Sequence, residues 1–340
     1  MLGFYFILLF GCNRSLPLVN LSGNAWGTTY SIKIISDKNI SHNISEIKLG
    51  IDSIIVDIDN QMSTYKINSE ISLFNNLPKN GAINISHGFS EVIKRSIYWS
   101  EVTLGSFDIT IFPAVINWRQ GKKDREYNDI WEPPTDLDII MEMEKIGYDK
   151  IKLSDNTLKK SITGQMIDVN AIAKGWGVDQ IFDYLKFNGY SRFMVEVGGE
   201  IRVLGLNNKG KKWEIGIDKP IRGNNPGENI IGEVARLKDQ AMATSGNYRN
   251  YYEFDGNKYS HIIDPRNGKS IFSDISSVTV VAPNCLDADV LATALNVLSY
   301  NEGLQLINSL DRYEALWIID VGYNNNFKVE YSPGMPVIWY

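Results

Sequence analysis

An aspartate, an alanine and a lysine stand at three-residue steps in QMIDVNAIAKGWGVDQ, residues 165–180. The pattern predicts an apolar strand that runs into a helix. A helix N-terminus with Lys174 nearby favours a phosphate. Asp168 could accept hydrogen bonds from a ribose or a ring N–H, and the small Ala171 could offer its carbonyl. The alternative is a helix capped by Asp168 or Asn170 with Lys174 in solvent, and the spacing leaves both open.

A second pair of oxygen-bearing side chains lies in NCLDADVLATALNVL, where Asp289 and Thr293 are four residues apart at a helix start. Residues at this spacing share one helix face. A carboxylate, a hydroxyl and a backbone carbonyl from elsewhere form a hard oxygen site that suits Mg²⁺. The alternative is an N-cap by Asp287 with Thr293 inside an ordinary helix.

Two earlier segments could hold a heteroaromatic ligand. In GSFDITIFPAVINWRQG, Ser106 leaves the backbone accessible, Phe107 offers a ring face, and Asp108 is an acceptor before an expected apolar strand. In QMSTYKINSEIS, Tyr65 could stack on the same ligand, although an ordinary amphipathic surface residue is the simpler interpretation of it alone.

His261 is a candidate general base. It follows a tyrosine-rich strand and begins HIIDPRNG, downstream of an expected tight polar turn at 244–246. A histidine beside small hydroxyls can accept a proton near neutral pH. A structural role is the alternative for this histidine.

The elements that must position these residues mix helices and strands. An alternating strand is expected from Trp26 to Ile34, a one-sided helix over 47–62, and a second helix over 89–104. A helix after Asp168 should end at Asn188–Gly189. The later chain reads as strands, then helices at 287–297 and 302–309, then strands. This order lacks the regularly alternating βαβ units of a doubly wound sheet, so it predicts a mixed α+β fold.

Composition narrows the function classes. The 340 residues are 44% hydrophobic and 22% charged, as in an ordinary globular protein with one large domain or two closely joined subdomains. The formal net charge of −6 argues against a dedicated nucleic-acid binder, because phosphates would need a basic excess.

The N-terminus resembles a secretion signal. MLGFYFILLFGC is almost wholly apolar and ends in a small residue before Cys12, the layout of a bacterial lipobox. The signal would span residues 1–12, with Cys12 lipidated, and residues 13–22 would form a polar tether. A buried strand with an incidental cysteine is the alternative. Cys285 is expected to be a small, partly buried residue rather than a catalytic thiol.

Seven segments in this order resemble the ApbE family of flavin transferases, from about Gly23 to Asn308. They are MSTYKINSEIS, GSFDITIFP, DVNAIAKGWGVD, VGGEIRVLG, ATSGNY, HIIDPRNG and TVVAPNCLDADVLATAL. The resemblance implies one catalytic domain over 23–340, with T-fold-related mixed sheets and packed helices in two intimately joined subdomains. It also implies an enzyme that uses Mg²⁺ to transfer FMN from FAD to a Ser/Thr hydroxyl of a target protein and releases AMP.

The resemblance also assigns site residues. It implies Mg²⁺ ligation by the Ala171 carbonyl, Asp289 and Thr293, and a base role for His261. It implies FAD contacts from Trp26, Tyr65, Ser106, Phe107, Asp108, Asp168, Lys174 and Ile263. Trp26 stands where the family often has methionine, and Ser106 where alanine is commoner.

The resemblance further implies acceptors that are membrane redox subunits with a short Ser/Thr-containing motif. It implies a lipid-anchored enzyme on the outer, periplasmic face of the cytoplasmic membrane, with the outer membrane as the less favoured location. An FAD pyrophosphatase that releases free FMN and AMP would use the same metal site, and a non-catalytic FAD-binding lipoprotein is the alternative from another class. A binder would need neither a metal site nor a base.

Overall fold

The computed structural model describes residues 16–35, 44–121, 131–221, 223–224, 228–247, 251–322 and 326–339. Cys12 lies outside these ranges, so the lipobox remains a prediction. No helix within them is long and apolar enough to cross a membrane.

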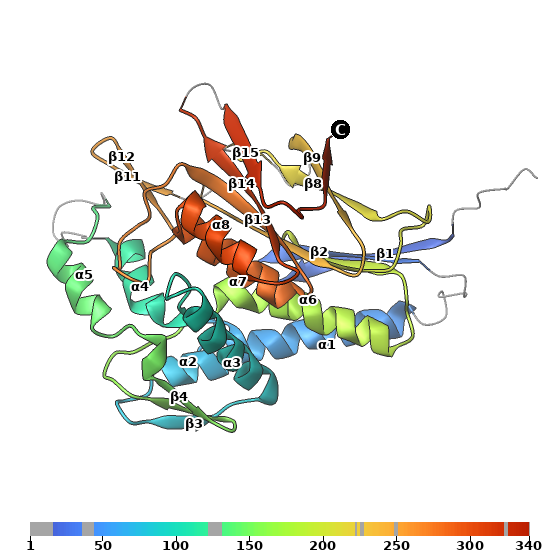
Figure 1. The fold of residues 1–340 in the computed structure, drawn as a ribbon. Helices are drawn as coiled ribbons and strands as arrows, with labels where there is room; N and C mark the ends of the chain where they lie inside the picture. Colours follow the sequence, from blue (N-terminus) through green and yellow to red (C-terminus); the bar gives the residue numbers. More distant parts are fainter. Residues whose placement is uncertain are drawn as a thin grey trace, which may run out of the picture.

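An antiparallel sheet of eight strands is the centre of the molecule (Figure 1). Its spatial order is β1-β2-β6-β7-β10-β13-β14-β15. The strands are β1 (Leu18–Ala25), β2 (Thr28–Ile35), β6 (Phe193–Val197), β7 (Glu200–Leu204), β10 (Ala241–Gly246), β13 (Ile275–Ala282), β14 (Glu314–Asp320) and β15 (Phe327–Tyr331). Every residue of β13 is buried, as expected of a strand covered on both faces.

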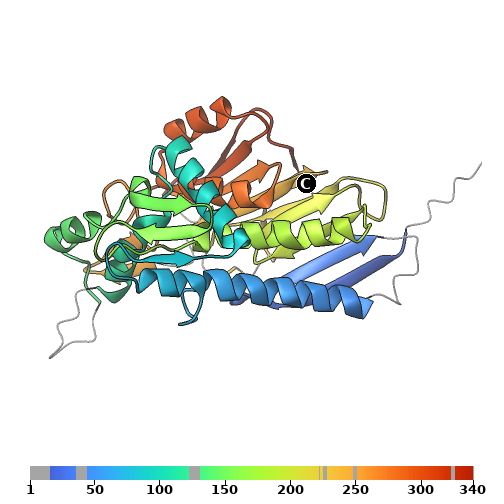
Figure 2. The ribbon, with the colours of Figure 1, turned by 90° about the horizontal axis from the view of Figure 1, so that it is seen from below.

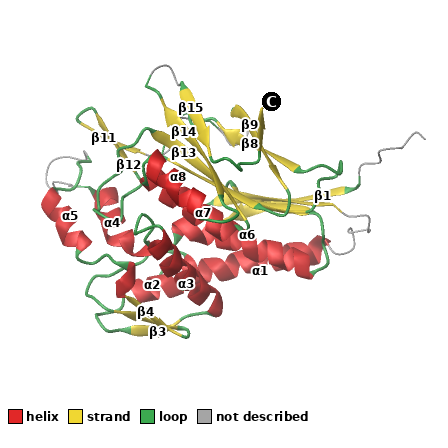
Figure 3. Cartoon of the chain, in the orientation of Figure 1, coloured by secondary structure: helices red, strands yellow, loops and turns green. Residues whose placement is uncertain are grey.

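Helices cover one face of this sheet (Figures 1 and 3). Two of them, α6 and α7, contact β7 directly, and α7 also packs on β10 and β13. The long α1 lies along α6, as Figure 2 shows from below. The helices are α1 (Ile44–Met62), α2 (Glu70–Asn75), α3 (His87–Val102), α4 (Phe112–Gln120), α5 (Asp136–Met143), α6 (Asn170–Phe187), α7 (Cys285–Val297) and α8 (Tyr300–Ser309).

Smaller sheets complete the fold. The sheet β16-β9-β8 joins β8 (Trp213–Asp218), β9 (Ile230–Leu237) and β16 (Val337–Trp339). Apolar residues of these strands share one cluster with residues of β7, β13 and β14. Two further sheets are β3-β5-β4, from β3 (Ala82–Asn84), β4 (Ile151–Ser154) and β5 (Thr157–Lys160), and the hairpin β11 (Tyr251–Phe254) with β12 (Asn257–Ser260).

The predicted mixed α+β class is confirmed, with the expected helices and strands displaced by a few residues at their ends. The tether expected over 13–22 is wrong from Leu18 onward. Leu18 begins strand β1, which pairs with β2 along its whole length, and Leu21 packs into the core. The polar residues of this segment occupy the more exposed positions of a sheet edge strand, which explains why the sequence reads as a tether.

Three local predictions around the site are also wrong. No strand forms at residues 161–169, directly before α6, because Asn75 from α2 supplies both backbone hydrogen bonds of Ile167, at 2.8 and 2.9 Å. A 3₁₀ turn (Ile109–Ile111) and α4 follow Asp108 in place of a strand, since Asp108 caps the turn and Pro113 stands at the helix start. Residues 244–246 form the end of β10 rather than a tight turn, because they pair with β13.

Candidate active site

One cavity of about 270 Å³ brings together most of the predicted site residues. Its walls come from the segment before α4, the start of α6, β7, β10, the segment after β12, and α7. The predicted residues that line it are Ser106, Phe107, Asp108, Asp168, Ala171, Lys174, His261, Ile263, Asp289 and Thr293. These positions are spread over nearly two hundred residues of sequence, so the fold itself assembles the site.

Trp26 and Tyr65 are not among the residues that line this cavity. Trp26 occupies the β1–β2 turn, where its Nε1 donates to the carbonyl of Ile55 at 3.1 Å. Its ring covers Gly177 of α6, where an added Cβ would lie 2.0 Å from a ring carbon. Tyr65 follows α1 and is 85% exposed. Their contacts with FAD stay predictions.

Lys174 lies in the centre of the polar wall. Its ammonium forms an ion pair with Glu200, whose side chain is almost fully buried at the start of β7. Burial alone would lower the pKa of Lys174, but the charges of Asp289 and Glu200 together raise it above its ordinary value. Lys174 therefore stays protonated in a cavity that four carboxylates also line, those of Asp108, Asp168, Glu200 and Asp289.

Glu200 is a site residue that the sequence did not single out. It lines the cavity, its Oε1 accepts from Lys174, and its Oε2 is buried with no hydrogen-bond partner among the described residues. Burial raises the pKa of this carboxyl. The one local signal is the Gly198–Gly199 turn before it, in which both glycines have positive φ and set the entry into β7.

The three predicted metal ligands meet where α6 crosses α7. Asp289 is buried, and its Oδ2 accepts the N–H of Gly175 at 3.0 Å. In a regular helix this N–H would donate to the carbonyl oxygen of Ala171. Because it donates to Asp289, the Ala171 carbonyl shares or loses its usual hydrogen-bond donor. Thr293 stands one turn after Asp289 on α7.

This donor set fits Mg²⁺ in its chemistry. A carboxylate, a hydroxyl and a carbonyl are hard oxygen ligands, and Mg²⁺ usually keeps several waters or phosphate oxygens besides a few protein ligands. The described residues contain no group of three or more His, Cys, Asp or Glu side chains suited to a metal. The predicted site would thus take only one carboxylate from the protein, Asp289.

Two contacts hold α7 against α6. An added Cβ on Gly175 would lie 2.4 Å from the carbonyl oxygen of Cys285, so only glycine permits this approach. Further along α6, the Asp179 carboxylate accepts the N–H groups of Cys285 and Leu286 at 2.9–3.1 Å and pairs with Arg202 at 2.7 Å. Burial raises the pKa of Asp179 to about 6.

Neither Cys285 nor Asp287 has a direct role in the cavity lining. Burial raises the pKa of the Cys285 thiol well above its ordinary value, which fits the expected inert residue. The N-cap of α7 is Asn284 rather than Asp287. The buried Asp287 carboxylate instead accepts from Trp99 Nε1 at 2.7 Å and from the Tyr313 hydroxyl at 2.8 Å.

Asp168 is not the N-cap of α6, which is Val169 without a side-chain cap bond. Its Oδ1 accepts the N–H of Asn170 at 2.7 Å, and its side chain lines the cavity; its contact with FAD stays a prediction. Burial raises the pKa of Asp168, and the nearby charge of Arg119 opposes that rise. Arg119, in the last turn of α4, lines the same cavity and brings a second cation that the sequence did not single out.

The segment 106–108 forms the opposite wall. The Asp108 carboxylate accepts the N–H of Thr110 at 2.8 Å and the N–H of Tyr148 at 3.0 Å, so it orders the local backbone. The hydroxyl oxygen of Ser106 is buried and has no hydrogen-bond partner among the described residues. A ligand atom in the cavity could supply that missing bond.

His261 stands at the cavity mouth. It is exposed, it follows the last residue of β12, and it lines the cavity together with Ile263 and with Thr244 and Ser245 of β10. A histidine in this position can reach both the cavity and a molecule that approaches from solvent. This geometry suits a base for an acceptor that enters from outside.

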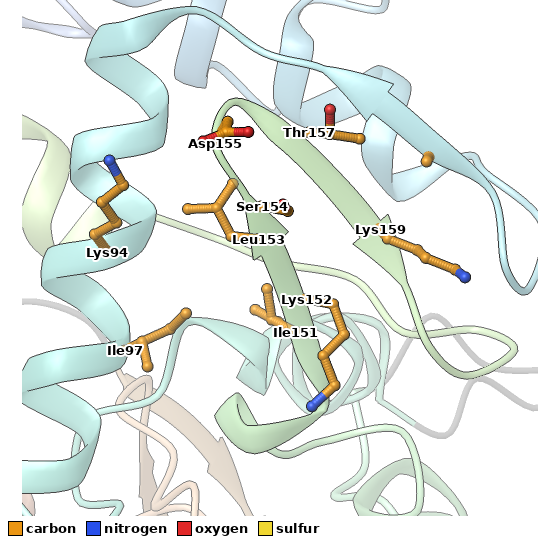
Figure 4. A pocket seen from close by; sticks show the side chains of 10 residues that line it. Lys94, Ile97, Ile151, Lys152, Leu153, Ser154, Asp155, Thr157 and Lys159 are labelled. Atoms are coloured by element: carbon orange, nitrogen blue, oxygen red, sulfur yellow. The ribbon is translucent and has the colours of Figure 1, made fainter.

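A second hollow, of about 500 Å³, lies between α3 and the β4–β5 strands (Figure 4). Its walls carry Ile97, Ile151 and Leu153, with Lys94 and Lys159 beside them. It contains none of the predicted site residues. The chemistry-bearing groups therefore gather in the smaller cavity.

Comparison with known proteins identifies the family of the chain. A model of the ApbE family matches residues 26–317. The FAD:protein FMN transferase of Vibrio cholerae is 37% identical over 96% of this chain and 96% of its own. The Haemophilus influenzae protein of the same name is 37% identical over 88% of this chain and 86% of its own.

Solved structures show the same likeness. Flavin transferase ApbE from Vibrio cholerae has a TM-score of 0.80 at 36% identity and covers 94% of this chain and 98% of its own. The apo form of Pseudomonas stutzeri flavinyl transferase ApbE has a TM-score of 0.81 at 28% identity, over 94% and 95% of the two chains.

Proposed function

The chain belongs to the ApbE family, and from this premise we propose that it transfers FMN from FAD to a Ser or Thr hydroxyl of a target protein, with release of AMP. One observation carries the proposal: Lys174, Asp289 and His261 line a single cavity although they come from three distant parts of the chain. Binding of FAD alone would require neither a base nor a metal ligand.

Different residues of the cavity would serve different requirements of phosphoryl transfer. We propose that Lys174 and Arg119 attract the pyrophosphate, and that the start of α6 adds its partial positive charge. Ala171, Asp289 and Thr293 would hold Mg²⁺, which supplies charge neutralisation at the phosphate oxygens. Positioning and charge neutralisation are the main requirements of this reaction class.

His261 would act on the acceptor. It takes the proton of the acceptor hydroxyl as that oxygen forms a bond to the FMN phosphorus. The bond from this phosphorus to the AMP oxygen breaks, and AMP leaves with that electron pair. The products are an FMN phosphoester on the protein, AMP and one proton.

A mass measurement tests the function. Purified enzyme, FAD, Mg²⁺ and a Ser/Thr-containing acceptor domain of a membrane redox protein are incubated, and the acceptor is weighed by mass spectrometry. An FMN-sized gain that requires FAD and disappears when free FMN replaces it supports the transferase. Free FMN with an unmodified acceptor would instead indicate a pyrophosphatase, and intact FAD would indicate a binder.

We also propose that Cys12 carries a lipid that anchors the enzyme at the periplasmic face of the cytoplasmic membrane. The support is the apolar run that ends at this cysteine. Expression of the full chain with radiolabelled palmitate tests it: the wild type should be labelled and sediment with membranes, and Cys12→Ser should do neither. Equal labelling of the two proteins would reject the anchor.

A further inference from the structure

Phe272 is a large apolar side chain that the fold leaves in solvent. It is 98% exposed, more than any other large apolar residue among those described. It lies between β12 and β13, in the same connecting segment as His261 but at a position that the catalytic proposal does not use. One exposed aromatic side chain is ordinary by itself, but aromatic residues are enriched among those that carry the binding energy of protein interfaces.

The segment that carries Phe272 is attached to the catalytic histidine segment. The N–H of Ile271 donates to the carbonyl of Ile262 at 3.0 Å, and Ser270 forms a bridge with Ile263. Ile262 follows His261 directly and lines the FAD cavity. Phe272 therefore continues a short ribbon whose other strand carries the proposed base.

A hollow of about 600 Å³ lies beside this ribbon. Phe272 lines it, together with Ile275, Leu298 and Tyr300, and Lys269 and Asp274 add charged groups. The hollow and the cavity proposed for FAD adjoin at Val297, which lines both. Val297 stands one turn after Thr293, a proposed metal ligand, on the same helix.

We propose that this hollow, with Phe272 at its edge, is the docking site for the acceptor protein; the inference rests on the proposed transferase function. The acceptor must deliver a hydroxyl to His261 at the cavity mouth, so part of its surface has to cover the adjoining ribbon. The apolar residues that line the hollow would fit an extended acceptor segment that has an apolar side chain close in sequence to the modified Ser or Thr. That side chain packs against Phe272 and Leu298, while the hydroxyl passes Val297 into the cavity.

Steady-state transfer kinetics with varied acceptor concentration test the docking site. For Phe272→Ala we expect the acceptor KM to rise about 10- to 30-fold, the size of a hot-spot loss, with kcat almost unchanged. The dissociation constant for FAD, measured by flavin fluorescence, should stay at the wild-type value. Because Phe272 packs against so little of the protein, the variant should unfold at the wild-type temperature.

Phe187→Ala is the matched control. Phe187 is 91% exposed at the end of α6, on a helix end that contributes nothing to the cavity or the hollow. Its removal should leave the acceptor KM unchanged. An equal rise of KM in both variants would show a general surface effect and overturn the docking site.

A double-mutant cycle identifies the partner side chain. Replacement of the apolar acceptor residue by aspartate should raise KM with the wild-type enzyme and add little with Phe272→Ala. Unchanged acceptor KM in Phe272→Ala, with normal transfer by the wild type, rejects the docking site alone. Failure of the wild type to modify any acceptor rejects the transferase function and the docking site with it.

Discussion

The ammonium of Lys174 interacts with two buried carboxylates: it pairs directly with Glu200 on β7, and the charge of Asp289 on α7 helps to raise its pKa. The arrangement joins the proposed phosphate-binding cation to the proposed metal ligand. We expect an ionised Glu200 to hold Lys174 on one side and so to leave Asp289 available for Mg²⁺. Glu200 would then act as a positioning residue.

Neutralising Glu200 should weaken metal binding. In Glu200→Gln the ammonium of Lys174 would be drawn toward Asp289 and compete with Mg²⁺. We expect the Mg²⁺ affinity to fall about 10- to 100-fold, as for other residues that orient a metal ligand. Calorimetric titration of metal in the presence of FAD measures this. Glu196→Gln, on the neighbouring strand β6 and outside the cavity lining, is the control and should bind normally.

Replacing Asp289 should abolish the metal dependence itself. Asp289→Asn keeps the shape of the side chain but removes the only carboxylate of the proposed site. Transfer by enzyme treated with chelator and resupplied with Mg²⁺ should fall at least about 100-fold, since the metal supplies several kcal/mol of charge stabilisation. Wild-type transfer rates after the same treatment would refute the site.

Gly175→Ala should damage the α6–α7 contact. The new Cβ would meet backbone atoms of Cys285, which cannot turn aside, so we expect a loss of about 1–3 kcal/mol in the free energy of unfolding. Gly50→Ala is the contrasting change. Its Cβ would meet the hydroxyl and two ring carbons of Tyr184 at 2.2–2.9 Å, and this side chain, unlike backbone, can turn aside, while alanine favours the helix by up to about 1 kcal/mol. Urea unfolding compares the two, and equal stability of both variants would contradict the tight contact.

Removing the histidine should separate binding from transfer. His261→Ala should bind FAD with nearly wild-type affinity, because His261 stands at the mouth. FMN transfer should fall by about two to four powers of ten, the usual contribution of a general base. Single-turnover measurements with saturating acceptor test this. Normal transfer would reject the role of His261.

A buried carboxylate far from the cavity predicts a pH dependence of stability. Glu233 on β9 is buried, and both of its carboxylate oxygens lack a partner among the described residues. Burial raises its pKa in the folded state above the ordinary value of 4.5. The unfolded chain then releases this proton at lower pH than the folded protein. The contribution of Glu233 to stability is therefore full below its unfolded pKa and is lost as pH rises through the folded pKa.

Glu233→Gln should remove the loss of stability that ionisation of Glu233 causes at high pH. At pH 8 the variant should be more stable than the wild type by about 1–3 kcal/mol, the cost of an unsatisfied buried polar group, and the difference should shrink toward pH 5. Denaturant unfolding between pH 5 and 8 measures it. Glu253→Gln, at an exposed position of β11, should show no such trend. A difference that grows as pH falls would contradict the assignment.

Local sequence patterns predict most of the helices and strands. They fail where contacts with residues distant in sequence determine the local structure. The spacing of Ile47, Ile51 and Ile58 predicts α1 because one buried face determines that helix. The strand expected at Ile167 does not form because Asn75, far away in sequence, takes both of its backbone bonds. No local rule can foresee such a partner.

The candidate site likewise contains residues that the sequence predicts and residues that only the fold reveals. The family resemblance placed His261, Lys174 and Asp289 in one site, and the structure brings them to one cavity. The sequence does not predict Glu200 as a site residue, because an acidic residue at the start of a strand has no distinctive local pattern. Its role becomes visible only in the fold, where it forms an ion pair with Lys174. Arg119 was not singled out for the same reason: it stands at the end of a largely apolar helix that reaches the cavity only through tertiary packing.

The crossing of α6 and α7 has a thermodynamic consequence. Gly175 donates its N–H to Asp289, and Asp179 accepts two backbone N–H groups at the start of α7, so the helices are joined at both ends of their contact. These bonds need neither metal nor substrate. The proposed oxygen ligands would thus be preorganised, and little conformational entropy would have to be lost if an ion and the flavin nucleotide bind there.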